Sequence, residues 1–574
     1  MLRKIQLLLL VSTIFNVYLS ADDHRKINMV DPVFHEAPIT STNLTKTAAV
    51  MYEITSSGSY YIANDLTVKG TIATSPTFIK ISASNVSLNL NSQNIIFDTA
   101  SAQTDCIAIE VAASLSNVSI FNGTITGIKG TGIKIGSGCS FVEVKDMLIQ
   151  KCDNVGMTFD TANNVNIENV TITGCSGEST TTSIATAAKF ATCTNVSIKK
   201  SNFNNNISTL TPSTTDPATD LEDTISLYIT NSTGITIEDC NANSNKGGTC
   251  YGLRLTGSKG CAILNCNFIG NEGQQGIAYG CSLESCQSTR IEGCTSQYNT
   301  SAQSDAVGFN ISGSTGLTFR KAIANYNFTP TAGINTYGFK LASSNSNQFI
   351  DSEAIANLST KLCYGFHLSS ASNDNKFQSC SAQYNTSSGV VTAGGSSSYG
   401  FYLTAGQANS IDKCIVNGNG NFNSASPISS IGCGIAFNVG ETRSMITNSE
   451  IFDNSSIVGE SYGIKFGSAT ETILSCLVKY TKMSNNKGGA KSYGFKDFSA
   501  DMSSLLIANI SFGHGKIGQL NASNAIIDTG LLNYMLTFTD TSKKATSFIK
   551  DIDTSTLDTL STANPNFSNL SLYN

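Results

Sequence analysis

Charge, tryptophan and long apolar runs are scarce in this sequence of 574 residues. Charged residues make up 13%, against roughly 25% in ordinary soluble domains. This excludes a coiled coil, which would be about half Ala, Glu, Lys, Leu and Arg. A formal net charge of −6 excludes a nucleic-acid binder that neutralises phosphates through a basic excess. Hydrophobic residues, at 40%, are sufficient to bury a large core, so the chain is not expected to be disordered.

The first residues have the layout of a secretory signal peptide. Arg3 and Lys4 form a basic region, residues 5–15 form an apolar run, and Leu19-Ser20-Ala21 ends in a small residue before a cleavage point. We expect residues 1–21 to be removed, with an uncleaved membrane anchor as the alternative. The mature chain is then secreted, periplasmic or on the cell surface, where disulfides can form. No other stretch approaches 18 apolar residues, so no further membrane span is expected.

A repeat runs from residue 235 to residue 486. Each of its nine copies has a small residue at a central position, called position zero below: Cys240, Cys266, Cys294, Ala322, Ser352, Cys380, Cys414, Ser449 and Thr481. Three residues earlier, every copy has a large apolar residue. Five residues later, every copy has asparagine: Asn245, Asn271, Asn299, Asn327, Asn357, Asn385, Asn419, Asn454 and Asn486. Agreement of all nine copies at two positions does not arise by chance.

A second pattern alternates with the first and reads Tyr-Gly-hydrophobic-x-hydrophobic. Examples are Tyr251-Gly252-Leu253-Arg254-Leu255 and Tyr364-Gly365-Phe366-His367-Leu368. Its apolar residues are two apart, which is the spacing of a β-strand. No repeat contains an amphipathic helix, which excludes the helical solenoids, and a propeller blade needs four strands in about 40–45 residues. The pattern therefore predicts an all-β coil of two or three strands per turn, stacked on the next coil as a parallel β-helix.

In such a stack, equivalent residues of neighbouring coils lie about 4.8 Å apart. Position zero then becomes a column of small residues inside the coil. The nine asparagines become an inward ladder of amides at a corner, where they hold the turns in register. We assign them a structural role.

The pattern continues upstream in weaker form. Asn117-Val118-Ser119-Ile120 and Asn164-Val165-Asn166-Ile167 open similar strands, and an early coil reads Asn85-Val86-Ser87-Leu88-Asn89-Leu90-Asn91. On these segments the chain resembles the right-handed parallel β-helix proteins of the pectin-lyase-like superfamily, in particular secreted bacterial ones. The resemblance covers roughly residues 50–500. It implies one right-handed solenoid with N- and C-terminal caps, divided as follows: signal peptide 1–21, N-terminal segment and cap 22–50, β-helix 51–500, and C-terminal cap or tail 501–574.

The resemblance does not imply one function, because the superfamily holds lyases, hydrolases, epimerases, adhesins and phage tailspikes. Polygalacturonases of this kind use several Asp, a Gly-His-Gly and an Arg-x-Lys. Only Gly513-His514-Gly515 matches, the one adjacent Asp pair is Asp22-Asp23, and no Arg-x-Lys occurs. None of the five arginines of the mature chain lies in a lyase motif. We therefore expect a binding or scaffold protein, with a lyase or hydrolase of an acidic polysaccharide, or an adhesin, as alternatives.

Two sets of residues are candidate sites. A polar insertion at 207–224 carries carboxylates that fit Ca²⁺, with a solvated loop as the alternative: Asp216, Asp220, Glu222 and Asp223. No other cofactor is evident. The outward residues of the Tyr-Gly strands form a column free of acidic residues: Arg254, Ser282, Asn310, Lys340, His367, Tyr402, Ala436, Lys465 and Lys496.

The basic and aromatic members of this column, namely Arg254, Lys340, His367, Tyr402 and Lys465, predict a strip for an acidic polysaccharide. The alternative is a solvated face on which lysine guards against aggregation. Five of the 17 cysteines occupy position zero. They are expected to pack as small hydrophobic residues, with disulfides along the stack possible but not favoured.

Overall fold

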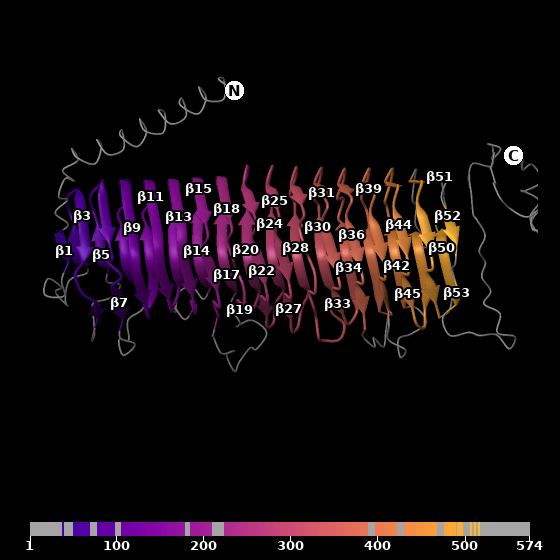
Figure 1. Cartoon of the computed structure of the whole chain (residues 1–574), viewed down its shortest axis with the longest axis horizontal. Coiled ribbons are helices and arrows are strands. Elements are labelled where there is room, and N and C mark those ends of the chain that lie inside the picture. The colour runs from indigo at the N-terminus through magenta and orange to yellow at the C-terminus, as the bar shows by residue number, and fades with distance from the viewer. Residues whose placement is uncertain are drawn as a thin grey trace, which may run out of the picture.

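The computed structural model describes residues 37–39, 50–68, 77–97, 105–177, 184–208, 223–388, 396–421, 430–467, 476–489, 491–497, 505–507, 510–512 and 515–516. In these ranges the regular elements are strands, and every strand pairing is parallel. The predicted signal peptide and most of the predicted C-terminal segment lie outside them. Figure 1 shows the strands stacked along the long axis in chain order.

One sheet receives one strand from each coil. It has 16 strands, so the described residues form 16 coils that contribute to this sheet. The strands are β2 (Val50–Ile54), β5 (Thr77–Ile81), β8 (Cys106–Val111), β10 (Gly130–Ile135), β12 (Val155–Asp160), β14 (Ala185–Ala191), β17 (Thr224–Thr230), β20 (Cys250–Thr256), β24 (Ala278–Glu284), β28 (Ala306–Ser312), β30 (Thr336–Ala342), β34 (Leu362–Ser369), β38 (Ser397–Leu403), β42 (Ile431–Phe437), β46 (Glu460–Phe466) and β50 (Lys491–Asp497).

A 20-stranded sheet forms the facing wall of the coil. Its strands are β1 (Ala37–Ile39), β3 (Gly58–Ile62), β4 (Leu66–Val68), β6 (Val86–Asn89), β7 (Asn94–Phe97), β9 (Ser116–Thr126), β11 (Ser140–Gln150), β13 (Asn163–Thr173), β15 (Thr194–Lys199), β16 (Asn202–Asn204), β18 (Thr233–Glu238), β21 (Ala262–Leu264), β25 (Arg290–Glu292), β29 (Thr318–Arg320), β31 (Gln348–Ile350), β35 (Lys376–Gln378), β39 (Ser410–Asp412), β43 (Met445–Thr447), β47 (Leu477–Lys479) and β51 (Leu505–Ile507).

Short strands close the later coils in further parallel stacks. One kind contains β22 (Asn267–Ile269), β26 (Thr295–Gln297), β32 (Glu353–Ile355), β36 (Ser381–Gln383), β40 (Ile415–Asn417), β44 (Glu450–Phe452), β48 (Lys482–Ser484) and β52 (Ile510–Phe512). The other contains β19 (Lys246–Gly247), β23 (Glu272–Gly273), β27 (Thr300–Ser301), β33 (Leu358–Ser359), β37 (Thr386–Ser387), β41 (Gly420–Asn421), β45 (Ser455–Ser456), β49 (Lys487–Gly488) and β53 (Gly515–Lys516). β51, β52 and β53 pair with β47, β48 and β49, so the stack continues beyond the predicted boundary at residue 500.

The predicted all-β fold, a single parallel β-helix, is confirmed. Its interior consists of columns of like side chains. Phe309, Phe339, Phe366 and Phe401 stack with ring centroids 4.6–5.0 Å apart. Parallel stacking at this spacing follows from the coil repeat, because one ring lies above the next at each turn. All 17 cysteines are free and buried, as small apolar side chains rather than a disulfide framework.

The nine asparagines of the repeat lie inside, fully buried. In eight of the nine, from Asn245 to Asn454, the side-chain Nδ2 donates to the Oδ1 of the asparagine in the next coil, at 2.8–3.0 Å. From Asn271 to Asn454, Nδ2 also donates to a backbone carbonyl of the preceding coil, as Asn357 does to Ala324. Asn206 adds a tenth rung, donating to Asn245 at 3.0 Å. We call this column the amide ladder.

Candidate functional site

The outer face of the 16-stranded sheet carries the predicted basic column. Its geometry depends on the glycine of each Tyr-Gly pair, where the alternation of inward and outward side chains is broken in every strand at the same place. In the parallel pairing of β20 with β24, Tyr251 lies opposite Tyr279, and Leu253 lies opposite Cys281. A Cβ built on Gly252 would lie 2.9 Å from the amide nitrogen of Asn271, so this glycine faces inward beside Leu253. Because two successive residues face inward, the preceding tyrosine points out.

The outward tyrosines form a row along the face, which we call the outer tyrosine row: Tyr251, Tyr279, Tyr337, Tyr364, Tyr399, Tyr462 and Tyr493. Neighbouring rings stack at centroid distances of 4.8–5.4 Å. Val307 and Cys433 interrupt the row but belong to the same cluster, which is separate from the main core. The row therefore forms a second apolar layer on the outside of the coil, and the neighbouring side chains pack against it.

All five predicted ligand residues lie beside this row. The distances from the guanidinium, ammonium group or ring to the nearest tyrosine centroid are 4.8 Å for Arg254, 4.5 Å for Lys340, 4.6 Å for His367, 4.7 Å for Tyr402 and 5.9 Å for Lys465. Lys340, His367 and Tyr402 come from the adjacent strands β30, β34 and β38. Seven coil steps separate Arg254 from Lys465, or roughly 34 Å at 4.8 Å per coil.

Carboxylates outside the column balance part of its charge. Glu284 accepts two hydrogen bonds from Arg254, at 3.2 Å from Nε and 3.0 Å from Nη2. Asp305 pairs with Lys340 at 3.4 Å. These four side chains are about a quarter exposed. Glu284 lies two residues beyond the column and Asp305 lies before β28, so the column alone did not indicate them.

His367 is the most constrained member of the group. Its ring lies 4.6 Å from Tyr364, 5.3 Å from Tyr337 and 5.4 Å from Tyr402, centroid to centroid. Its Nδ1 is buried and has no hydrogen-bond partner among the described residues. Burial first, and the positive charge of Lys340 second, lower the pKa of His367 to about 3. The imidazole is therefore neutral near pH 7 and offers one donor and one acceptor.

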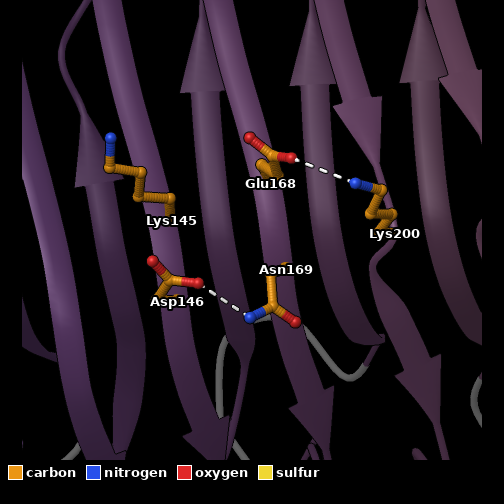
Figure 2. A pocket seen from close by; sticks show the side chains of 5 residues that line it. All are labelled: Lys145, Asp146, Glu168, Asn169 and Lys200. Atoms are coloured by element: carbon orange, nitrogen blue, oxygen red, sulfur yellow. Dashed lines mark hydrogen bonds and ion pairs between the residues drawn. The ribbon is translucent and has the colours of Figure 1, made fainter.

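Sequence reasoning did not single out a hollow at the other wall of the coil (Figure 2). It has a volume of about 390 Å³ and is lined by Lys145, Asp146, Glu168, Asn169 and Lys200. Asp146 accepts a hydrogen bond from Asn169 at 2.7 Å, and Glu168 pairs with Lys200 at 3.6 Å. With two cationic and two anionic side chains, already engaged in part, the hollow is electrostatically balanced.

The predicted calcium residues lie almost entirely outside the described ranges. Of the four, Asp223 alone is described, and its Oδ1 accepts a hydrogen bond from the backbone N–H of Thr249 at 3.2 Å. No group of three or more His, Cys, Asp or Glu side chains in the described ranges could hold a metal ion. In the same ranges, no helix has the length and hydropathy needed to cross a membrane. Gly513 and His514 also lie outside, whereas Gly515 belongs to β53.

No protein-family model and no curated protein matches this chain. Solved structures give distant matches. The Dettilon tailspike protein (gp208) is 10% identical with a TM-score of 0.34, over 57% of this chain and 59% of that chain. This chain thus spans less than two thirds of the tailspike chain. The A-module of the Azotobacter vinelandii mannuronan C-5 epimerase AlgE6 is 11% identical with a TM-score of 0.30, over 79% and 91%.

The periplasmic alginate epimerase AlgG is 10% identical with a TM-score of 0.29, over 71% of this chain and 77% of that chain. Likeness this low carries no argument about activity. The architecture is defined by the parallel stacks themselves: the chain is a parallel β-helix protein.

Proposed function

We propose that this protein is exported and binds an extended polysaccharide along the outer face of the 16-stranded sheet, as a binding or scaffold protein. The observation that carries the proposal is the group of Lys340, His367 and Tyr402. These side chains come from adjacent coils, lie beside the outer tyrosine row and remain partly exposed. A face that repeats at every coil suits a polymer of repeating units.

An acidic polysaccharide fits this face better than a neutral one. The carboxylate of a uronic acid can replace Glu284 beside Arg254 or Asp305 beside Lys340, because both cations already hold a carboxylate in place. The neutral imidazole of His367 can hydrogen-bond a sugar hydroxyl, and partly exposed rings can pack against a sugar ring. Since both cations are partnered, we expect modest affinity that decreases as salt is added.

Affinity electrophoresis tests the proposal. Wild-type protein should migrate more slowly in native gels containing alginate or polygalacturonate than in gels containing dextran. The triple variant Lys340→Ala, His367→Ala, Tyr402→Ala should lose at least about tenfold in affinity, the effect of about 1.4 kcal/mol. Lys376→Ala removes an exposed lysine of β35 on the opposite wall and should bind like wild type. Equal retardation of the triple variant and wild type would exclude this face.

The alternatives give different results in the same samples. Shortened polysaccharide chains after incubation would indicate a lyase or hydrolase. Binding to intact cells without binding to any soluble polysaccharide would indicate an adhesin. The acidic insertion stays a proposed Ca²⁺ site: CaCl₂ should raise the melting temperature of wild type, but not that of the Asp220→Asn, Glu222→Gln variant.

A further inference from the structure

A different group of tyrosines is exposed at one corner of the coil. Tyr298, Tyr326 and Tyr384 each lie four residues after position zero, with 53%, 45% and 54% of the residue exposed. The backbone N–H of Tyr298 bonds to the coil of Tyr326, and that of Tyr326 bonds to the next coil. The three side chains therefore follow one line along the stack, which we call the corner tyrosine row. It is separate from the outer tyrosine row, whose members are mostly buried.

The backbone at this position is in the left-handed region. The φ angles of Tyr298, Tyr326 and Tyr384 are 55°, 56° and 54°. Glycine takes the same conformation without steric cost, and other coils use it there, at Gly270 and Gly418. An aromatic residue costs of order 1 kcal/mol in this region. Ser244, Ala356 and Asp453 take the same conformation at this position in other coils, so the corner itself does not require an aromatic side chain.

The arrangement of the rings suits a flat ligand. Tyr298 and Tyr326 stack at 5.1 Å with their planes 7° apart. The Tyr384 ring lies against Gly418, where an added Cβ would come within 2.4 Å of it. Between Tyr326 and Tyr384 the column is interrupted by Ala356, so a ring-bearing ligand can continue the stack at this coil.

The side chains beside the row are nearly uncharged. Outward positions of β26, β32, β36 and β40 carry Thr295, Gln297, Glu353, Ile355, Ser381, Gln383, Ile415 and Asn417, of which only Glu353 is charged. Ile415 is 43% exposed. Asn417 is 7% exposed, and its Oδ1 has no hydrogen-bond partner among the described residues. Amides and rings without charge complement a neutral ligand that has hydroxyl groups and apolar ring faces.

We propose that the corner tyrosine row binds a neutral linear glycan, with sugar rings packed against the tyrosines and hydroxyls bonded to the adjacent amides. Asn417 Oδ1 then accepts a hydroxyl hydrogen that it lacks in the free protein. This strip is independent of the proposed acidic-polysaccharide face, from which it differs in strands, charge and sugar class.

Native gels containing hydroxyethyl cellulose, galactomannan or pullulan test the strip. At least one of these polymers should retard wild type, and the triple variant Tyr298→Asn, Tyr326→Asn, Tyr384→Asn should lose at least about tenfold in affinity. Asparagine is chosen because it tolerates the left-handed backbone, so the variant should fold. The matched control is Tyr480→Asn, since Tyr480 is 54% exposed with φ of 53° but lies one residue before position zero.

The Lys340→Ala, His367→Ala, Tyr402→Ala variant should keep its retardation by the neutral polymer, which separates this proposal from the first. Three results would overturn it: no retardation of wild type by any of the three polymers, an equal loss in Tyr480→Asn, or undiminished binding by the triple variant. Sedimentation equilibrium could give a fourth such result. If wild type is a dimer and the triple variant is a monomer, the row binds a second copy of this chain and not a glycan.

Discussion

The early and the later coils solve the same problem of register in different ways. In the later coils the ladder position is asparagine, whereas the register of β9, β11 and β13 places Ile128, Cys152 and Cys175 in that column. These three strands, β9, β11 and β13, are each 11 residues long, and β11 pairs with β13 over nine residue pairs. The later strands of the same wall are three residues long, as in β25 with β29. Where continuous backbone pairing is short, side-chain amides take over the corner.

The largest effect is expected from cutting the amide ladder. Asn357→Ala removes the acceptor of both the backbone N–H and the Nδ2 of Asn327, at 3.1 and 2.9 Å, together with its own bond to Asn385. Leaving buried donors unsatisfied costs about 1–3 kcal/mol each, so we expect a loss of about 3 kcal/mol in the free energy of unfolding. Ile128→Val in the early coils should cost about 1 kcal/mol. Urea unfolding followed by circular dichroism would measure both losses in the free energy of unfolding. Equal losses in the two variants would show that the ladder is not needed for stability.

Asparagine placed at two positions of the early column, Ile128 and Cys175, should have two different costs in stability. Ile128→Asn buries an amide three coil steps away from Asn206, the first rung of the ladder, and should cost about 2–4 kcal/mol. Cys175→Asn should cost no more than about 1 kcal/mol, because the backbone N–H of Cys175 already donates to Asn206 Oδ1 at 3.0 Å. The new side chain can continue the ladder by one rung. Similar melting temperatures for the two variants would contradict this distinction.

Glu441 should give the later coils a pH dependence. It is fully buried at the end of a second column of side-chain amides, formed by Asn347, Asn375 and Asn409. Asn409 Nδ2 and the N–H of Gly406 each donate to Glu441 at 2.9 Å. Burial raises the pKa of Glu441 above its usual value, and these hydrogen bonds offset only part of the rise. A raised pKa in the folded state adds stability at low pH that is lost as pH rises through that pKa. The difference in stability between Glu441→Gln and wild type should therefore shift in favour of the variant as pH rises from 4 to 8, measured by thermal unfolding.

The smallest effect is expected from the charged face of the early coils. Lys200 pairs with Glu168 at 3.6 Å, and the two side chains are 66% and 42% exposed. Exposed pairs contribute up to about 1 kcal/mol, so Lys200→Ala should change the free energy of unfolding by less than about 0.5 kcal/mol. A loss as large as that of Asn357→Ala would show that surface charge, not strand length, replaces the ladder in these coils.

The spacing of the repeated residues was enough to predict the coil and the inward ladder of asparagines. The nine asparagines and the Tyr-Gly strands defined the coil, because one side chain recurs at one place in every turn. The start of the ladder at Asn206 lay outside the clean repeat. The partners Glu284 and Asp305 were missed because they sit outside the column that they neutralise. The corner tyrosines were missed because only three of the nine repeat copies carry them, while the other copies have serine, glycine, alanine, aspartate or asparagine at this position.

The amide ladder also allows coils of different length to stack on one another. Asn245 and Asn271 are 26 residues apart and Asn206 and Asn245 are 39 apart, yet the Nδ2–Oδ1 distances are 2.8 and 3.0 Å. A rung thus closes equally well over a short turn and over one that carries an insertion. Foreign peptide segments grafted into the long turns should therefore be displayed at coil-spaced intervals without disturbing the stack beneath them.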